Sequence, residues 1–505
     1  MPSPPETGGT SGPPPIATVE RRGIEHVPPQ ARWGQPGGLF WMWAGAVWNV
    51  EFVVYGGLAV IIGLSFAQAV LVIVVGNLSY VLTGLASLQG PQAGTTAFAI
   101  SRAPFGPRGN KAPSFFNWIT QVGFEIEGIA LIVLAAIALT AKAGFLAGAA
   151  AKVIFIVAAI AIQAVLPLLG HAAVLKVLKW LAVPFIVLFA VMAALTTSKV
   201  RLHAVPHGAS WGSLTIVLAL VIAAGGLGWT ENASDYSRYL PPAASRKRIV
   251  AAVALGGAIP SALLEILGAA VATGVPALAA TGSAGAVSIS GLPSAFPAWF
   301  IVPYLVFAIV QLFAINTLDL YSSGVTLQSL FPRLSRIHCV AIDTVVCAAL
   351  AAYAVFSSRF STLLYDFLLL IIVWLAPWCA IYLVDSWLRK NRYDGPALLS
   401  GDPDGRYFRG RGGQDVRGGA RRRDFHWPGI IAQAAGMVAA ALWLNAYPPY
   451  VGPLASRIGG ATGSDFSVFL GLIVGGLTYW LLARRSVPAE ADALPAEAGA
   501  APGRA

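Results

Sequence analysis

An amide and a carboxyl group stand within the apolar stretch "QLFAINTLDLYSSGVTLQ", which runs from Gln311 to Gln328. These residues, Asn316 and Asp319, are three positions apart, so a helix would place them on one face. The amide donates and accepts hydrogen bonds, whereas an ionised carboxylate only accepts them. Acids inside a membrane span cost about 2.5–3.5 kcal/mol and usually face a bundle interior or a watery cavity. The pair therefore predicts solute or proton binding inside a helical bundle.

A second polar stripe lies in an apolar segment near residue 125. Gln121, Phe124, Glu125 and Gly128 follow the i, i+3, i+4, i+7 spacing of one helix face, and Glu127 is expected on another face. The stripe offers an aromatic ring, two hydrogen-bonding groups and a glycine that leaves space. It suits a planar polar ligand, although a polar contact between two helices would use the same residues.

Two further apolar segments are interrupted by glycine close to polar or aromatic residues. In "GLFWMWAGAVWNVEFVVYGG", Gly45 precedes Asn49 and Glu51. In "AAGGLGWTENASDYSRYLPP", a glycine cluster ends at Gly228, directly before Trp229. Helix breaks in corresponding halves of a chain free backbone N–H and C=O groups and mark the mid-membrane site of many transporters.

The elements that position these residues are membrane-spanning helices. The chain is 57% hydrophobic and 11% charged, whereas a soluble domain is about 25% charged. Apolar runs of about 20 residues recur, each long enough to cross a bilayer, and they lack the alternation of a membrane β-barrel. The fold class is therefore an all-α polytopic membrane protein. About twelve spans are expected at 38–62, 66–88, 115–139, 145–169, 172–196, 212–233, 248–274, 298–322, 337–357, 361–387, 428–446 and 464–483.

The chain divides into a transport core and flanking segments. We expect a disordered tail at 1–37, a core at 38–387, a basic loop at 388–427, two extra spans at 428–484 and a second disordered tail at 485–505. The segment 90–113 is expected to be partly helical, and 275–297 an outer loop or hairpin.

The basic residues indicate orientation. Lysine and arginine gather in the loops that lie inside if the N-terminus is inside, so both termini are expected to be cytoplasmic, in the plasma (inner) membrane. Most of the formal net charge of +11 is thus a topology signal, and no nucleic-acid partner is expected. The three cysteines, Cys339, Cys347 and Cys379, lack metal-ligand spacing, so we expect core residues and no cofactor.

Seven acidic residues fall within the expected spans: Glu51, Glu125, Glu127, Glu265, Asp319, Asp343 and Asp366. Asp343 and Asp366 lie close to span ends, where a bond to a buried hydroxyl or a place near the interface would explain them. Glu51, Glu125 and Asp319 are the candidates for a functional role.

The quoted segments resemble the nucleobase-cation symporter-1 family, of the purine-cytosine permease type. "VERRGIEHVPPQAR" is similar to the tail before its first span, and "TTAFAISRAPFGPRGNK" to the connection before its third. "GLGWTENASDYSRYLP" resembles its span 6 signature, "NTLDLYSSGVTLQSL" its span 8 pattern and "WLAPWCAIYLVDSW" its span 10. Together the matches extend from the tail to about residue 390.

The resemblance implies a LeuT-like fold of two inverted five-helix repeats followed by two extra helices. It implies a base held between spans 1, 3, 6 and 8, with Phe124 and Trp229, beside Gly228, enclosing the ring. Asn316 matches the first asparagine of the span 8 pattern, and Asp319 stands where the second asparagine would be.

Two departures from the family pattern bear on the coupling ion. Sodium-coupled members carry a hydroxyl pair in span 8 at the positions of Phe313 and Ala314, which offer no side-chain oxygen. Buried carboxyl groups can instead bind and release protons. We therefore expect proton symport, with Asp319, Glu125 or Glu51 as the protonatable group.

The predicted function is import of a nucleobase or related heterocycle, cytosine or a purine first, by a transporter that works as a monomer in the lipid bilayer. The main alternative is symport of another small solute on the same fold, such as an amino acid, allantoin, a hydantoin or a thiamine-like compound. A channel would show polar stripes along several spans, and the motifs of intramembrane enzymes are missing beside the acids. The aromatic pair favours a base, because a base needs ring stacking.

Overall fold

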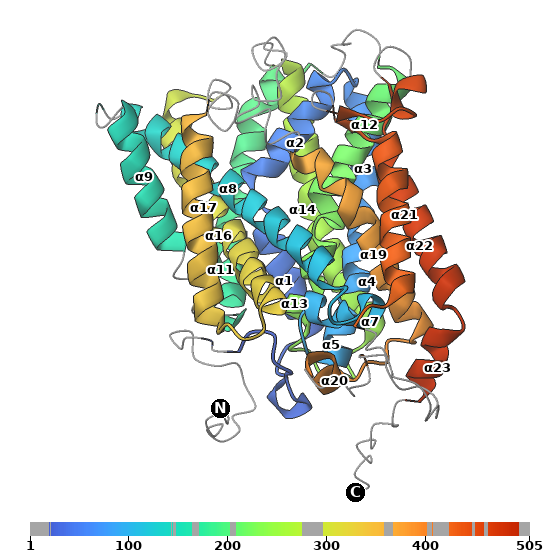
Figure 1. The fold of residues 1–505 in the computed structure, drawn as a ribbon. Coiled ribbons are helices and arrows are strands. Elements are labelled where there is room, and N and C mark those ends of the chain that lie inside the picture. Colours follow the sequence, from blue (N-terminus) through green and yellow to red (C-terminus); the bar gives the residue numbers. More distant parts are fainter. Residues whose placement is uncertain are drawn as a thin grey trace, which may run out of the picture.

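The computed structural model describes residues 20, 22–142, 144, 148–163, 171–201, 209–274, 296–357, 367–400, 407, 424–446, 450–458 and 463–493. These residues form a bundle of long helices that run from one end of the molecule to the other (Figure 1). Within the described part, eight helices are long and apolar enough to cross a membrane, and two bent helix pairs raise the number to ten. Two shorter apolar helices cover the remaining two expected spans.

A helix or a pair of helices thus occupies each of the expected spans. In chain order they are α1 (Pro36–Val47) with α2 (Val50–Ile61), α3 (Phe66–Asn77) with α4 (Tyr80–Ala86), α8 (Lys111–Lys142), α9 (Gly148–Gln163), α11 (His171–Thr196), α12 (Trp211–Ile222) with α13 (Ala233–Ser237), α14 (Arg246–Gly274), α16 (Ala298–Leu330), α17 (Arg336–Phe356), α19 (Ile372–Leu388), α21 (Trp427–Trp443) and α22 (Ser467–Ala483).

Short elements join these helices. They are η1 (Pro29–Ala31), α5 (Gln89–Ala93), α6 (Ala97–Ile100), α7 (Arg102–Phe105), η2 (Thr197–Lys199), the π-helical turn η3 (Ala223–Leu227), η4 (Thr230–Asn232), α20 (Gly395–Leu399), η6 (Ala455–Arg457) and α23 (Ser486–Asp492). Two short strands, β1 (Asn445–Ala446) and β2 (Tyr450–Val451), pair antiparallel. The helices α5, α6 and α7 confirm that segment 90–113 is partly helical, whereas 275–295 lies outside the described residues.

The first and sixth spans are both broken. Between α1 and α2 the chain bends by 61°, and Asn49 caps α2 by accepting the backbone N–H of Glu51 at 3.2 Å. The sixth span loses helical geometry at Gly225, whose φ and ψ are −98° and −126°. The break in the first span comes after Gly45 rather than at it. Gly45 packs against the backbone of Leu178 on α11, where a Cβ would overlap the carbonyl group.

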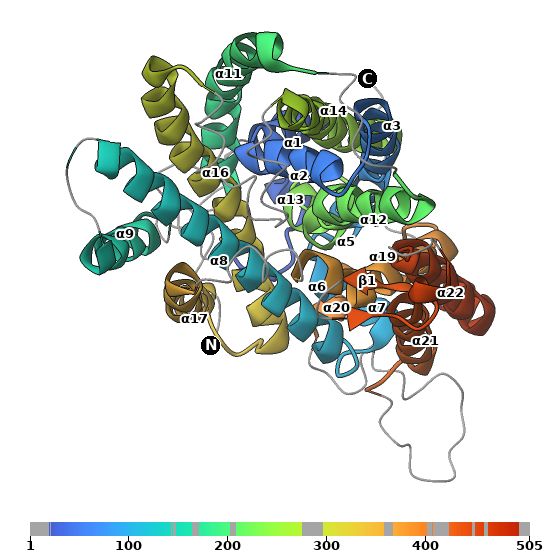
Figure 2. The same cartoon turned by 90° about the horizontal axis from the view of Figure 1, so that it is seen from above.

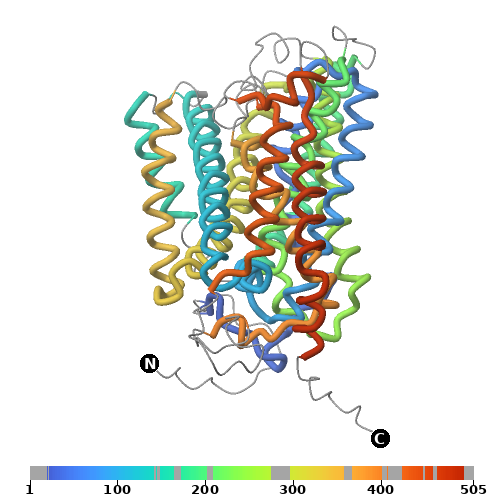
Figure 3. The backbone as a smooth tube through the Cα atoms, turned by 45° about the vertical axis from the view of Figure 1, so that its right-hand side comes forward, coloured from blue at the N-terminus to red at the C-terminus, as the bar shows by residue number. Residues whose placement is uncertain are grey.

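Two long helices, α8 and α16, cross at the centre and make the most extensive contact between any two elements described. Seen from above, α8 runs across the molecule from α9 to the region of α6 and α7 (Figure 2). Around this cross, α1 and α2 pack on α14, while α21 and α22 run side by side and pack on α19 (Figure 3). The broken segments of spans 1 and 6 therefore reach a central region bounded by α8 and α16.

The structure differs from the expected disorder over the second half of segment 1–37. Ile24 and Val27 are buried, with 6% and 0% of their surface exposed. The Ile24 N–H donates to Gln328 Oε1 at 2.9 Å, and the Val27 N–H donates to the Gly94 carbonyl at 2.7 Å. Apolar side chains and backbone hydrogen bonds thus hold this proline-rich segment against the ends of the helices. Residues 1–19 lie outside the described part.

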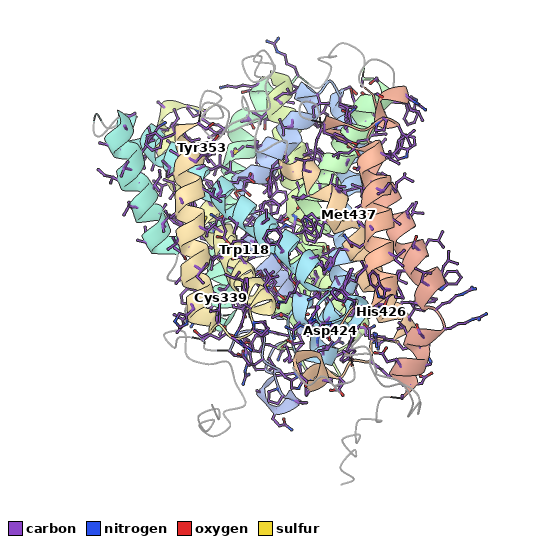
Figure 4. All side chains as sticks on the ribbon, viewed as in Figure 1. Trp118, Cys339, Tyr353, Asp424, His426 and Met437 are labelled. Carbon is purple, nitrogen blue, oxygen red and sulfur yellow. The ribbon has the colours of Figure 1, made fainter. Side chains whose placement is uncertain are left out.

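The segments expected as a basic loop and a C-terminal tail are also ordered in part. Asp424 forms an ion pair with Arg108 at 2.9 Å, and the His426 N–H donates to the Phe105 carbonyl at 2.9 Å. Both residues lie at the lower end of the bundle beside α7 (Figure 4). The tail begins with the helix α23, which lies at the same end as α7 (Figure 1).

The C-terminal end of α19 is fixed by a buried arginine. Arg389 forms an ion pair with Asp385 at 2.8 Å and reaches Glu490 of α23 at 3.1 Å. Breaking a buried pair leaves an uncompensated charge and costs about 3–5 kcal/mol. We expect Arg389→Met to lower the thermal unfolding midpoint of the detergent-solubilised protein by several degrees. Arg392→Ala is the matched control.

Arg392 also binds α23, through Asp492, but its side chain is 43% exposed. Exposed ion pairs contribute about 0–1 kcal/mol, so Arg392→Ala should leave the unfolding midpoint nearly unchanged. Equal midpoints for the two variants would show that burial of Arg389 adds no stability.

Candidate functional site

A cavity of about 430 Å³ opens where the broken spans meet α8 and α16. Its lining comes from α2, α8, α16 and the irregular segment between α12 and α13: Glu51, Phe52, Tyr55, Gln121, Phe124, Glu127, Ala224, Gly228, Trp229, Asn232, Ile315, Asn316 and Asp319. A polar cavity of this kind between helix breaks is typical of a transporter's central binding site.

Four aromatic side chains line the cavity: Phe52, Tyr55, Phe124 and Trp229. Phe124 of α8 and Trp229 of the irregular segment are each held by a ring outside the lining. Trp229 meets Trp43 of α1 edge to face, with ring centroids 5.3 Å apart and an angle of 79°. Phe124 meets Phe367 in the same way at 5.2 Å and 79°. Edge-to-face contacts fix ring orientation while leaving another surface available. The two rings can therefore present flat faces to a planar ligand.

The amide groups beside the rings form a fixed network. Gln121 donates to Glu231 and, at 3.2 Å, to Asn232 Oδ1, and Asn232 donates back to Gln121 Oε1 at 3.3 Å. The Asn117 amide nitrogen, oriented toward Glu231, lies 2.6 Å from Glu231 Oε2. Glu231 is fully buried, so it anchors both amides of α8 behind the cavity wall.

Three carboxyl groups line the same cavity: Glu51, Glu127 and Asp319. Their exposed fractions are 8%, 3% and 4%. The Tyr55 hydroxyl donates to Glu127 Oε1 at 3.1 Å. Carboxylates accept hydrogen bonds and attract positive charge, so this wall favours N–H donors, cations or protons.

Asn316 lines the cavity, but its amide nitrogen forms hydrogen bonds with residues outside the lining. Its Nδ2 donates to the Glu125 carbonyl at 3.2 Å and to Gln163 Oε1 of α9 at 3.0 Å. Gly128 makes room for this amide, because a Cβ at Gly128 would overlap the Asn316 side chain.

A side chain at position 128 is expected to disturb Asn316. We expect Gly128→Ala to displace the Asn316 amide and to raise the half-saturation concentration for uptake, with the protein still inserted in the membrane. Gly38→Ala is the control, since a Cβ there would meet nothing within 4 Å. Unchanged uptake kinetics in Gly128→Ala would show that the position of Asn316 has no effect on transport.

Of the residues singled out from sequence, seven line this cavity: Gln121, Phe124, Gly228, Trp229, Asn316, Asp319 and Glu51. Asn49 does not, because its side chain caps α2. Glu125 also faces elsewhere, into a second cavity beside α17. The helix face predicted for α8 is thus rotated: Glu127, expected on another face, lines the cavity in place of Glu125.

The remaining acids have other surroundings. Glu265 accepts from Asn77 at 2.6 Å. Asp343 is fully buried and accepts a hydrogen bond from the buried Ser323 hydroxyl, which is one of the two explanations expected for it. Asp366 lies outside the described residues.

Sequence reasoning missed Tyr55, Asn232 and the anchoring Glu231. Asn232 and Glu231 stand inside the "GWTEN" segment that was noted for its tryptophan, and Glu231 was absent from the acids assigned to the spans. The i+3 spacing from Phe124 to Glu127 was a signal that could have found Glu127.

Residues 26–446 match the family described as "Permease for cytosine/purines, uracil, thiamine, allantoin". The chain belongs to this family. As a permease it is a multi-pass membrane transporter rather than an enzyme, as the sequence indicated.

Two named relatives extend over nearly the whole permease. "Putative purine-cytosine permease YxlA" of Bacillus subtilis (strain 168) is 28% identical over 481 residues, covering 92% of this chain and 96% of the relative. "Purine-cytosine permease fcyB" of Emericella nidulans is 26% identical over 486 residues, covering 92% and 88%.

Solved structures of Mhp1, a nucleobase-cation-symport-1 family transporter, share the fold of the permease. A closed conformation with bromovinylhydantoin bound has a TM-score of 0.65 at 18% identity and covers 94% of this chain and 96% of Mhp1. The inward-facing conformation has a TM-score of 0.67 at 17% identity and covers 94% and 98%. The likeness confirms the predicted all-α polytopic fold.

Proposed function

We propose that the permease imports an amino-substituted nucleobase, cytosine or an aminopurine, together with protons. The observation that carries this proposal is a cavity in which aromatic rings, Phe124 and Trp229 among them, meet three carboxyl groups. A nucleobase has two π faces for the rings Phe124 and Trp229, and base–aromatic stacking is worth about 1–3 kcal/mol per base. The two relatives are named as purine-cytosine permeases, which supports the same substrate class.

The carboxyl groups favour an amino-substituted base over an oxo-base. Cytosine and adenine carry an exocyclic amino group that donates two hydrogen bonds, whereas uracil presents a carbonyl oxygen at that position. An ionised Asp319 only accepts hydrogen bonds, so it would pair with the amino group and leave a carbonyl unpaired. A buried unpaired group weakens binding, and this is the basis of selectivity.

Protons are proposed as the coupling ion. Asp319 and Glu51 lie in the cavity, and buried carboxyl groups of this kind can bind and release protons. Glu125 lies outside the cavity but close to its Asn316 edge. Phe313 and Ala314 supply no side-chain oxygen for a sodium ion.

The permease is proposed to act as a monomer in the plasma (inner) membrane, with both termini in the cytoplasm. The basic connections around α7 and the start of α14 lie at the same end of the bundle as α20 and α23 (Figure 1), which agrees with the enrichment of basic residues on the cytoplasmic side. Exposed side chains such as Leu71, Val157 and Val345 give the helices an apolar outer surface for lipid.

Uptake of labelled cytosine and adenine into proteoliposomes tests this proposal. We expect accumulation when the outside is made acidic, its loss with a proton uncoupler, and stronger competition by amino-substituted bases than by uracil, allantoin, thiamine or amino acids. Accumulation that follows a sodium gradient and ignores the uncoupler would contradict proton coupling. If only an amino acid or thiamine competed for uptake, a nucleobase would not be the substrate.

A further inference from the structure

A second cavity, of about 180 Å³, lies between α8, α9, α16 and α17. Its lining consists of Glu125, Ile129, Ile160, Gln163, Leu320, Thr344 and Cys347, and it shares none of these residues with the substrate cavity. Glu125 is the acidic group on its wall. The Glu125 side chain does not line the substrate cavity; only its backbone carbonyl contacts that site, through Asn316.

Glu125 is 0% exposed, and neither of its carboxyl oxygens makes a well-formed hydrogen bond to another described residue. The charged group that acts on it most strongly is the carboxyl group of Asp343 on α17, four residues before Cys347, which lines the cavity with Glu125. Other titratable groups that face it are Cys347 of α17 and Asp319 of α16. The lining contributed by α9 is an isoleucine and the Gln163 amide, and none of the described residues that line the cavity is a lysine or arginine.

Asp343 already holds the donors that surround the pair. Trp118 Nε1 donates to Asp343 Oδ1 at 2.7 Å, and the Ser323 hydroxyl donates to Asp343 Oδ2. Trp118 lies on α8 (Figure 4), about two helical turns before Glu125 in the chain. A hydroxyl has one proton to donate, so Ser323 cannot donate to Asp343 and to Glu125 at once. A proton on Glu125 itself is the donor that would complete the arrangement.

We propose that Glu125 and Asp343 form a proton-binding site outside the substrate cavity, in which a single proton is held between two carboxyl groups. The inference rests on the proposed proton-coupled transport and assigns the proton a place. With the proton bound, Glu125 O–H donates to the Asp343 carboxylate and the pair carries one negative charge. When the proton leaves to water, two carboxylates remain side by side and repel each other.

The site is connected to the substrate cavity through Asn316. This residue lines the substrate cavity, while its Nδ2 is bonded to the Glu125 carbonyl and to Gln163, which lines the second cavity. A base that displaces the Asn316 amide therefore moves a contact of Glu125. Repulsion between Glu125 and Asp343 would in turn move α8 relative to α17, and α8 carries Phe124.

The test uses Glu125→Gln, which keeps the size of the side chain and mimics its neutral form. Labelled cytosine and labelled adenine are measured in proteoliposomes in two modes: accumulation driven by a proton gradient, and exchange against unlabelled base inside, which needs no net proton movement. We expect accumulation to fall by about 5–150-fold, the usual range of coupling between two sites, while exchange is retained. Glu265→Gln, which alters a buried acid bonded to Asn77, should keep both.

Two further measurements keep the test decisive. Asp343→Asn removes the other carboxylate and should also reduce accumulation more than exchange. This variant replaces Glu125→Gln in the test if Glu125→Gln is not recovered folded. Cytosine or adenine is added to purified protein in weak buffer with a pH indicator dye. Binding should change the number of protons bound to the parent protein but not to Glu125→Gln.

Proton-driven accumulation by Glu125→Gln at the parent level would overturn the inference and leave the proposed function standing. If the parent itself accumulates neither base in a proton gradient, the proposed function fails and the inference fails with it.

Discussion

Replacing Trp229 with alanine is expected to abolish uptake of the transported base while the protein remains in the membrane. The loss of one stacking face removes about 1–3 kcal/mol, which weakens binding by about 5- to 150-fold. Trp229→Phe should recover part of the affinity, because a smaller ring still stacks. Binding to purified protein and uptake into proteoliposomes measure the two effects separately.

Trp211 provides a matched control for this change. It begins α12 on the same span, and 79% of its surface is exposed. Trp211→Ala removes an equal volume of side chain without touching the cavity, so transport should be close to the parent level. Full uptake by Trp229→Ala at parent protein levels would show that the base does not stack on this ring.

Asp319→Asn is expected to change selectivity and coupling together. The amide can donate as well as accept, so it would pair with a carbonyl oxygen that the carboxylate leaves unpaired. An unpaired buried group costs about 1–3 kcal/mol, so the preference for cytosine over uracil should fall by about 5- to 150-fold. The side chain also loses its ability to bind a proton, and uptake should become less sensitive to the proton gradient.

Thr317→Val is the control on the same helix. The Thr317 hydroxyl donates to the Phe313 carbonyl of its own helix at 2.7 Å, and the residue does not line the cavity. The cytosine-to-uracil ratio should stay at the parent value in this variant. A ratio that is unchanged in Asp319→Asn as well would exclude Asp319 from recognition of the amino group.

The spans and their breaks could be predicted from the sequence because they depend on local properties. Apolar runs fix the number of helices, and the glycine cluster before Trp229 places the break of the sixth span at Gly225. The family motifs added the pairing of Phe124 with Trp229, which spacing within one helix does not show. Both rings do line one cavity.

The side of α8 that faces the cavity could not be fixed in the same way. Residues at i+3 and i+4 both lie near a given helix position, so the sequence pattern allowed either Glu125 or Glu127. Tertiary partners decide between them: Tyr55 of α2 bonds Glu127, and α17 brings Asp343 to Glu125. These neighbours are distant in the sequence and leave no local signal.

The N-terminal segment is more ordered than the sequence predicted. Its proline and glycine content predicted disorder, yet Ile24 and Val27 are buried against the bundle. A few apolar residues and backbone hydrogen bonds are enough to order a short segment when it packs on a surface of the bundle. Amino-acid composition alone does not predict that surface.

We propose that a base lies between Phe124 and Trp229 with its amino edge toward Asp319. A structure of the permease determined with cytosine or adenine at saturating concentration tests this binding mode directly. We expect a flat ligand between the two rings, with its exocyclic nitrogen within hydrogen-bond distance of a carboxyl oxygen of Asp319. A base bound outside this cavity, or bound inside it with its ring facing neither aromatic side chain, would exclude this binding mode.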